Sequence, residues 1–272
     1  MLSIKNIALP LLLIVSLSSC DDNIRNQDTD VSGAKSHVMS EQYFSDGFIW
    51  AHKVFSDGDF LTAITELKKN ETAIKSLTYS NTTYPVEVTV NFGADSNNVC
   101  LDGRTRNGEL KIKIWSAFKN NKSSFRVISR NYFINDIELE IEDTVLNIGI
   151  VDGFKTYEST IRKGHMFADT IIVEWSANKT WSWQAGHTTA TYDDDIYFVD
   201  DKVKALSYNG SSYRAETTSS MIWTLSCNWI NFGTILMQPE NVLFREINFG
   251  EGLCENLVQI SIGEKEFDIT ID

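Results

Sequence analysis

The sequence predicts a mainly β protein, either an antiparallel β-sandwich or a set of packed β-sheets, with a short N-terminal helical segment. After residue 76, apolar and polar side chains alternate in many short segments, as in 86–92 and 110–115, which is typical of half-buried strands. Asn209-Gly210 and Gly263-Glu264 suit the two-residue turns of β-hairpins. Only three prolines occur in 272 residues, so few positions interrupt strand pairing.

Residues 1–19 have the features of a signal peptide. Lys5 precedes an apolar run from Ile7 to Leu17, which is too short to cross a bilayer. The run ends in small residues directly before Cys20, and this arrangement resembles the lipobox of bacterial lipoproteins. The resemblance implies that Cys20 carries the lipid, palmitate included, and becomes the new N-terminus. An ordinary secretory signal is the alternative.

Residues 20–38 are predicted to form a flexible tether, because they lack an apolar period. Asp21 and Asp22 follow the cysteine, and acidic residues at this place resemble the surface-export signal of Bacteroidetes lipoproteins. We therefore expect a chain anchored by lipid to the outer membrane of the cell envelope. Whether it faces the periplasm or the cell surface stays open.

Residues 39–75 are predicted to be helical. Phe44, Phe48, Ala51 and Phe55 recur at spacings of three and four, which gives one apolar helix face. The stretch 57–59, Asp-Gly-Asp, then breaks or caps the run before apolar residues resume. We expect a helix pair or one kinked helix.

Residues 76–272 are predicted to form the β domain. The segment Asn91-Phe92-Gly93 precedes a loop with Cys100, and Asn248-Phe249-Gly250 precedes a loop with Cys254. A duplication into two related β halves is one explanation for this echo. The other is that each glycine ends a strand in a tight bend.

Charge and cysteine content exclude some classes. With 24 Lys and Arg against 37 Asp and Glu, the formal net charge is −13, so a nucleic-acid partner is excluded for lack of a basic footprint. Three cysteines remain besides Cys20, and we favour a disulfide between Cys227 and Cys254, because a strand-turn-strand segment could bring them together. Cys100 is then the free thiol, with no neighbouring group that would activate it.

Several stretches of the β domain resemble a family of uncharacterised Bacteroidetes cell-envelope lipoproteins. The stretches are 91–93 with Cys100, Asp102 to Gly108, Trp181 to Gly186, Cys227-Asn228-Trp229 with Gly233-Thr234, and Asn248 to Asn256. The resemblance implies a secreted β domain and names no reaction. Asn248 and Glu255 stand where family members commonly carry Asp, which argues against a metal site there.

Trp175, Trp181 and Trp183 are the candidate ligand-stacking residues. Trp181 and Trp183 are two positions apart and therefore share one face of a strand, and residues 176–179 could form a turn that sets Trp175 across from them. Exposed, the three rings would stack on sugars; buried, they would belong to the core, which is the commoner place for large aromatics in β folds.

We predict no metal site and no cofactor. Only four histidines are present, and Asp28-x-Asp30 matches only half of a calcium loop, because Met39 stands where a bidentate Glu is required. The acidic run 193–195 is predicted to be a solvated turn that keeps a sheet edge soluble, with calcium as the alternative. Arg104, Arg106 and Lys111 form a small basic island, which we expect in a hairpin loop or a partner-contact loop.

The motifs of common enzyme classes are absent from the sequence. We therefore expect a non-catalytic binding module for a glycan or a surface protein, held to the membrane by its N-terminal lipid. Two alternatives remain open. One is a structural or assembly component that pairs through exposed sheet edges. The other is a carbohydrate-active hydrolase with two converging carboxylates, a feature that no sequence pattern reveals.

Overall fold

The computed structural model describes residues 28–168, 171–189, 191–206 and 210–271. Its helices are α2 (Ser32–Phe55) and α3 (Phe60–Asn70). Its strands are β1 (Ser76–Tyr79), β2 (Val86–Gly93), β3 (Arg106–Ile114), β4 (Ser124–Ile134), β5 (Ile137–Glu140), β6 (Glu142–Val151), β7 (Phe154–Ala168), β8 (Ile171–Ala185), β9 (Ile196–Leu206), β10 (Ser212–Thr224), β11 (Phe232–Pro239), β12 (Arg245–Glu251), β13 (Leu257–Ile262) and β14 (Lys265–Thr270). Neither of these two helices is both long and apolar enough to cross a membrane.

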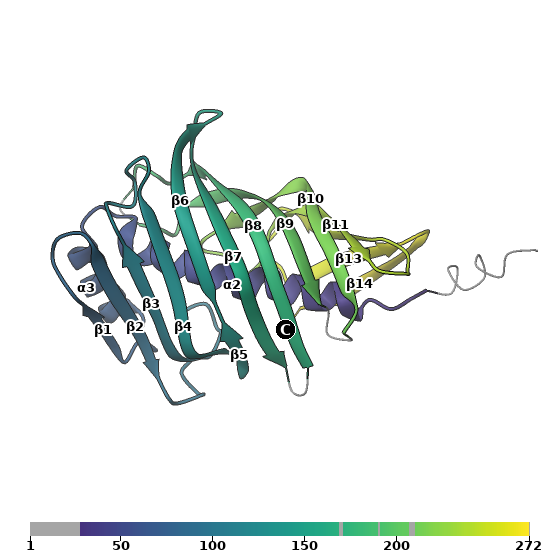
Figure 1. Cartoon of the computed structure of the whole chain (residues 1–272), viewed down its shortest axis with the longest axis horizontal. Coiled ribbons are helices and arrows are strands. Elements are labelled where there is room, and N and C mark those ends of the chain that lie inside the picture. The colour runs from purple at the N-terminus through teal and green to yellow at the C-terminus, as the bar shows by residue number, and fades with distance from the viewer. Residues whose placement is uncertain (1–27, 169–170, 190, 207–209, 272) are drawn as a thin grey trace, which may run out of the picture.

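The strands form one antiparallel sheet in nearly sequential order (Figure 1). Each strand pairs with its neighbours in the chain, except that β6 pairs with β4 and β7 beside the main path. The path runs unbroken from β1 to β14. The predicted class, mainly β and antiparallel with an N-terminal helical segment, is confirmed.

Helix α2 crosses the strands and forms the centre of the core (Figure 1). Its C-terminal half contacts β2, where the rings of Trp50 and Phe92 are 5.1 Å apart. Its N-terminal half contacts β10, where His37 lies 5.5 Å from Tyr213. At about 1.5 Å per residue, a helix of this length spans roughly 36 Å, which is enough to cross the middle of the sheet.

The helix is buried on nearly every side, with 18 of its 24 residues inside the protein. The predicted apolar face, which includes Phe44 and Phe48, packs on the sheet. The opposite positions are also buried although they carry polar side chains such as Gln42 and Asp46. Buried polar groups need hydrogen-bond partners, and the strands and loops around α2 supply most of them.

The helix begins earlier than the sequence predicts. Residues 32–38 were expected in the tether, but they are helical and mostly buried. The backbone N–H of Ser32 donates to Asp30 (2.9 Å), and Arg245 pairs with Asp28 (2.9 Å). The segment Asp28-x-Asp30 is therefore a fixed lead-in to α2, because Arg245 of β12 pairs with the Asp28 carboxylate and donates to the Asp30 carbonyl.

Three of the four Asn-x-Gly segments share a bend in a strand of the sheet. In each, the glycine N–H donates to the asparagine side chain, at 2.6 Å for Gly93, 2.9 Å for Gly149 and 2.9 Å for Gly250. The three glycines have φ values of 79°, 94° and 92°, which residues with a Cβ rarely adopt. The same bend occurs at Gly149, outside the echoed stretches, so a tight bend at a glycine is a recurring local feature of this sheet.

Candidate functional site

The three candidate stacking tryptophans lie in the core, so the prediction that they bind sugar rings is wrong. Trp175, Trp181 and Trp183 are 1%, 0% and 2% exposed. Trp181 stacks on Phe48 at 4.2 Å and Trp175 on Phe44 at 5.4 Å. All three belong to the single strand β8, so no turn separates Trp175 from the others. The three rings face inward, where they pack on apolar side chains of α2 instead of contacting water.

A histidine and an aspartate form a close pair that resembles part of a catalytic site. His52 Nε2 lies 2.6 Å from Asp195 Oδ2, and Tyr197 Oη lies 3.0 Å from His52 Nδ1. Trp183 Nε1 donates to the other Asp195 oxygen at 2.9 Å. His52 is 0% exposed, and burial lowers its pKa. A substrate cannot reach this pair, so it fixes α2 to the sheet.

The burial of Asp195 beside His52 corrects the interpretation of the acidic run 193–195 as a solvated turn. Asp195 is buried as the partner of His52, while Asp193 and Asp194 are exposed. Within the described residues, no group of three or more His, Cys, Asp or Glu side chains is arranged to hold a metal ion.

A second polar cluster joins α2 to β8 and β9. Lys179 donates to Glu41 and, at 3.1 Å, to Ser45. Burial, and then the Asp201 carboxylate, raise the pKa of Glu41 well above its ordinary value. His37 lies beside this cluster, and burial lowers its pKa to about 4. All of these groups are enclosed, so the cluster stabilises the helix position.

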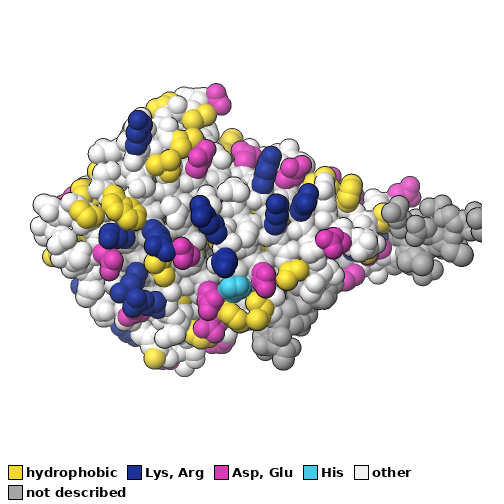
Figure 2. All heavy atoms as spheres, viewed as in Figure 1, with side chains coloured by type: hydrophobic (Ala, Val, Ile, Leu, Met, Phe, Trp, Pro, Cys, Tyr) yellow, Lys and Arg dark blue, Asp and Glu magenta, His cyan; other side chains and the backbone are white. Residues whose placement is uncertain are grey.

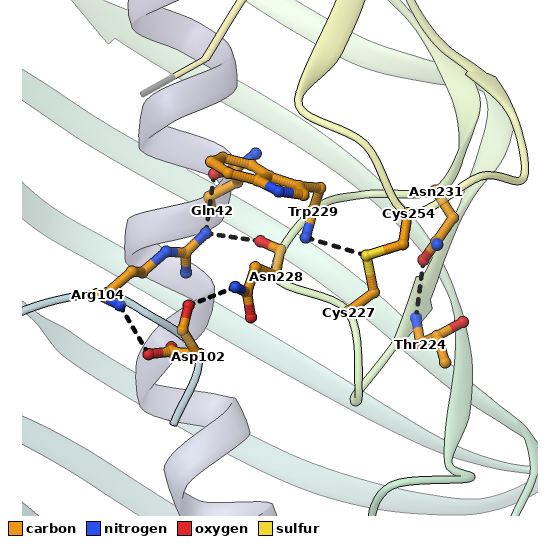
Figure 3. Close-up of a disulfide and its surroundings, with 9 residues drawn as sticks. All are labelled: Gln42, Asp102, Arg104, Thr224, Cys227, Asn228, Trp229, Asn231 and Cys254. Carbon is orange, nitrogen blue, oxygen red and sulfur yellow. Dashed lines mark hydrogen bonds between the residues drawn. A yellow bond between two sulfur atoms is a disulfide. The ribbon is translucent and has the colours of Figure 1, made fainter. Parts of the chain in front are cut away.

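Two residues of the basic island, Arg104 and Arg106, point inward, whereas Lys111 is half-buried on the opposite side of β3 from Leu110 and Ile112. Arg106 pairs with Asp46 of α2 (2.7 Å) and with Asp102 (2.6 Å). Arg104 donates to Gln42 (3.0 Å) and to the carbonyl of Asn228 (2.6 Å). Two loops thus meet over α2, one before β3 and one after β10 (Figure 3).

The cysteine pairing that the sequence favours is present in the structure. A disulfide joins Cys227 and Cys254 beside these loops (Figure 3), with Cα atoms 5.7 Å apart. Cys100 is free and buried, and burial raises the pKa of its thiol to about 12. A thiol this weakly acidic and enclosed does not serve as a nucleophile. The lipidation candidate Cys20 lies outside the described residues.

The candidate site is a groove on the outer face of the sheet, across β7 to β11. It consists of two adjoining hollows of about 930 and 900 Å³. The two hollows share Arg162, Ser176, Lys204, Arg214 and Gln238, one residue from each strand. We call this feature the outer groove. Each hollow lies in the size range of small-molecule sites.

Small side chains lie beneath one part of the groove, and Trp175 and Tyr213 lie beneath another part. Ala177, Val203 and Ala215 are opposite one another in register and point inward. Gly164 lies on β7 nearby, and a Cβ there would come within 2.6 Å of the Phe44 ring. Further along the strands, the inward row is Trp183, Tyr197 and Trp223.

The groove is positively charged although the protein is acidic. It is lined by five Lys or Arg residues (Arg162, Lys163, Lys202, Lys204, Arg214) and three Glu residues (Glu174, Glu216, Glu240), a local balance of +2 against −13 for the chain. Figure 2 shows Lys and Arg side chains gathered over the middle of this face. Sequence reasoning missed the groove, because the cations come from separate strands and no run of basic residues marks them.

Comparison with known proteins identified no relative of this chain. No family model, curated protein or solved structure matches this chain.

Proposed function

We propose that this protein is a lipid-anchored component of the bacterial cell envelope whose β domain binds a glycan, without catalysis, in the outer groove. The observation that carries the proposal is the contrast between two kinds of polar site. The pairs that resemble catalytic groups are enclosed in the core, whereas the outer groove is open and lined by side chains that can donate and accept hydrogen bonds.

A hydrolase is less well supported by the same groove. Its carboxylates are Glu174, Glu216 and Glu240, and glycosidases need two such groups about 5 to 10 Å apart across the scissile bond. Glu216 is opposite Lys202 and Leu236, and Glu174 is opposite His165. None of the three faces another in register, so the sheet does not present a carboxylate pair.

Assembly through sheet edges is also less well supported. The last strand, β14, carries Lys265, Glu266 and Asp268, and charges on an edge strand oppose pairing with another chain. The first strand, β1, has only four residues. These features are typical of edges that stay unpaired.

The test uses the full chain, expressed with its own signal in a bacterium that processes lipoproteins. Cys20→Ala should move the protein from the membrane fraction to the soluble fraction, since the lipid is its anchor. The detergent-purified wild type should bind members of a glycan array that includes neutral and acidic chains. Ser176→Trp should abolish that binding, because the indole fills the groove.

Thr89→Trp is the matched control, since Thr89 is half-buried on the outer face of β2, away from the groove. It should bind like wild type. Binding that survives Ser176→Trp, or no binding to any glycan, would rule out the groove as a glycan site. A soluble wild-type protein would rule out the anchor.

A further inference from the structure

We propose that the ligand of the outer groove is an acidic polysaccharide, bound through the carboxylates of its sugars by Lys204 and Arg214. This inference rests on the proposed function and names its ligand class. It is carried by the arrangement of charges across β8 to β11.

Two cations stand directly opposite each other at the centre of the groove. Ser176, Lys204, Arg214 and Gln238 are consecutive partners in register across four strands, and we call them the central row. Like charges directly opposite on one face destabilise a sheet, by about 0.2 to 1 kcal/mol for a cross-strand pair. Within the described residues, neither Lys204 nor Arg214 has an ion pair or a side-chain hydrogen bond to offset this. An anion bound between Lys204 and Arg214 would offset this repulsion.

The neighbouring row shows the usual arrangement. Lys202 lies directly opposite Glu216, two residues along the same strands. In this row a carboxylate of the protein faces the cation of β9, whereas in the central row a second cation faces it. The central row is the place where a carboxylate from outside would complete the pattern.

The rest of the lining fits a carbohydrate better than an acidic peptide. Ser176, Gln238, Thr160 and Asn178 supply hydroxyl and amide groups along the groove, which match sugar hydroxyls. An extended peptide that binds by strand addition would need a free strand edge for its backbone. The strands of the groove, β7 to β11, each have a partner on both sides.

The experiment compares three polymers on the mature full-length chain purified in non-ionic detergent. The probes are polygalacturonate, the same polymer with its carboxylates methyl-esterified, and poly-L-glutamate. Titration calorimetry at 50 and 300 mM NaCl should show that polygalacturonate binds at least tenfold tighter than either of the others. The higher salt concentration should weaken that binding, because exposed charges are screened.

Two variants locate the site. Lys204→Gln combined with Arg214→Gln should weaken polygalacturonate binding at least tenfold and reduce its salt dependence. Lys113→Gln, which removes one exposed charge from β3 of the same sheet outside the groove, should change the affinity less than threefold. Both side chains of the double variant are exposed, so it should fold, and an unchanged circular dichroism spectrum would verify this.

Each contrary outcome has a distinct meaning. Equal affinity for poly-L-glutamate would overturn the carbohydrate assignment in favour of an acidic protein. Binding of the esterified polymer as tightly as the acid, lost in Ser176→Trp but kept in the double variant, would overturn the charge requirement and leave the proposed function intact. Failure of every polymer to bind overturns the inference, and the glycan array then decides the proposed function separately.

Discussion

At the scale of single residues, the protein encloses an unusual number of ionisable groups around one helix. Glu41, Asp46 and His52 of α2 are each paired with a group from elsewhere in the chain. Breaking such a buried pair by removing one partner costs several kcal/mol, whereas an apolar replacement of the whole pair is often neutral. These groups therefore fix the position of α2 against the sheet more than they add to the free energy of unfolding.

Asp143 gives the clearest pH effect. It is 1% exposed on β6 and accepts a hydrogen bond from Ser159 (2.7 Å), and burial raises its pKa from 3.8 to about 6. Because the folded pKa is the higher one, stability from this group is complete below pH 3.8 and is lost as the pH rises to about 6. The loss is about 3 kcal/mol at 1.36 kcal/mol per pKa unit.

We predict that Asp143→Asn stabilises the protein at pH 7 by up to about 3 kcal/mol and flattens the pH dependence of unfolding between pH 4 and 6. Urea unfolding at several pH values measures both effects. Asp268→Asn, at an exposed position of β14, should leave the curve unchanged. A destabilised Asp143→Asn variant at pH 7 would show that the ionised carboxylate is needed.

At the scale of elements, β7 and α2 make a close contact beside the outer groove. Gly164 allows the Phe44 ring to approach, since a Cβ would lie 2.6 Å from Phe44 Cε1. The ring belongs to the helix interior and stacks on Trp175, so it cannot simply swing away. The strand pairing also shifts register between Ile161 and Gly164, which marks the place where β7 bends.

We predict that Gly164→Ala destabilises the protein by about 1 to 3 kcal/mol through overpacking. Phe44→Leu removes the clashing atoms, so the double variant should be more stable than the two single effects predict, with a coupling of at least about 0.5 kcal/mol. Thermal unfolding of the four proteins measures the coupling, and Lys163→Ala at the exposed neighbouring position is the control. Strict additivity would mean that the two residues do not touch.

At the scale of the whole molecule, the fold is one sheet organised around a central helix. The helix contacts strands from β2 to β10, and loops cover its other side. The buried apolar residues of α2 and of the strands form one cluster. The described part of the molecule should therefore unfold as one cooperative unit.

We predict that the backbone amides of residues 41–48 exchange with solvent only on global unfolding, as slowly as those of β8. Native-state hydrogen exchange read by mass spectrometry measures this. Amides of α3, which is largely exposed, should exchange faster and serve as the internal reference. Fast exchange of α2 with a protected sheet would mean that the helix leaves the core independently.

Much of the local structure follows from the sequence itself. The alternation of Val86, Val88 and Val90 predicts a strand with one buried face, and the structure has it. The spacing of Phe44 and Phe48 predicts a helix with an apolar face. Hairpin spacing favours the Cys227–Cys254 pair. Each of these features depends on residues close together in the chain, where periodicity and turn chemistry are informative.

The position of the helix and the candidate site depended on tertiary structure. Arg106 and Asp46 are 60 residues apart in the chain, and no local pattern indicates that one will neutralise the other. Lys204 and Arg214 meet only through strand register, and a slip of one residue would turn them inward. The sequence by itself therefore determined the elements and their buried faces. Only the tertiary structure decided what those faces enclose, because burial of polar groups depends on partners distant in sequence.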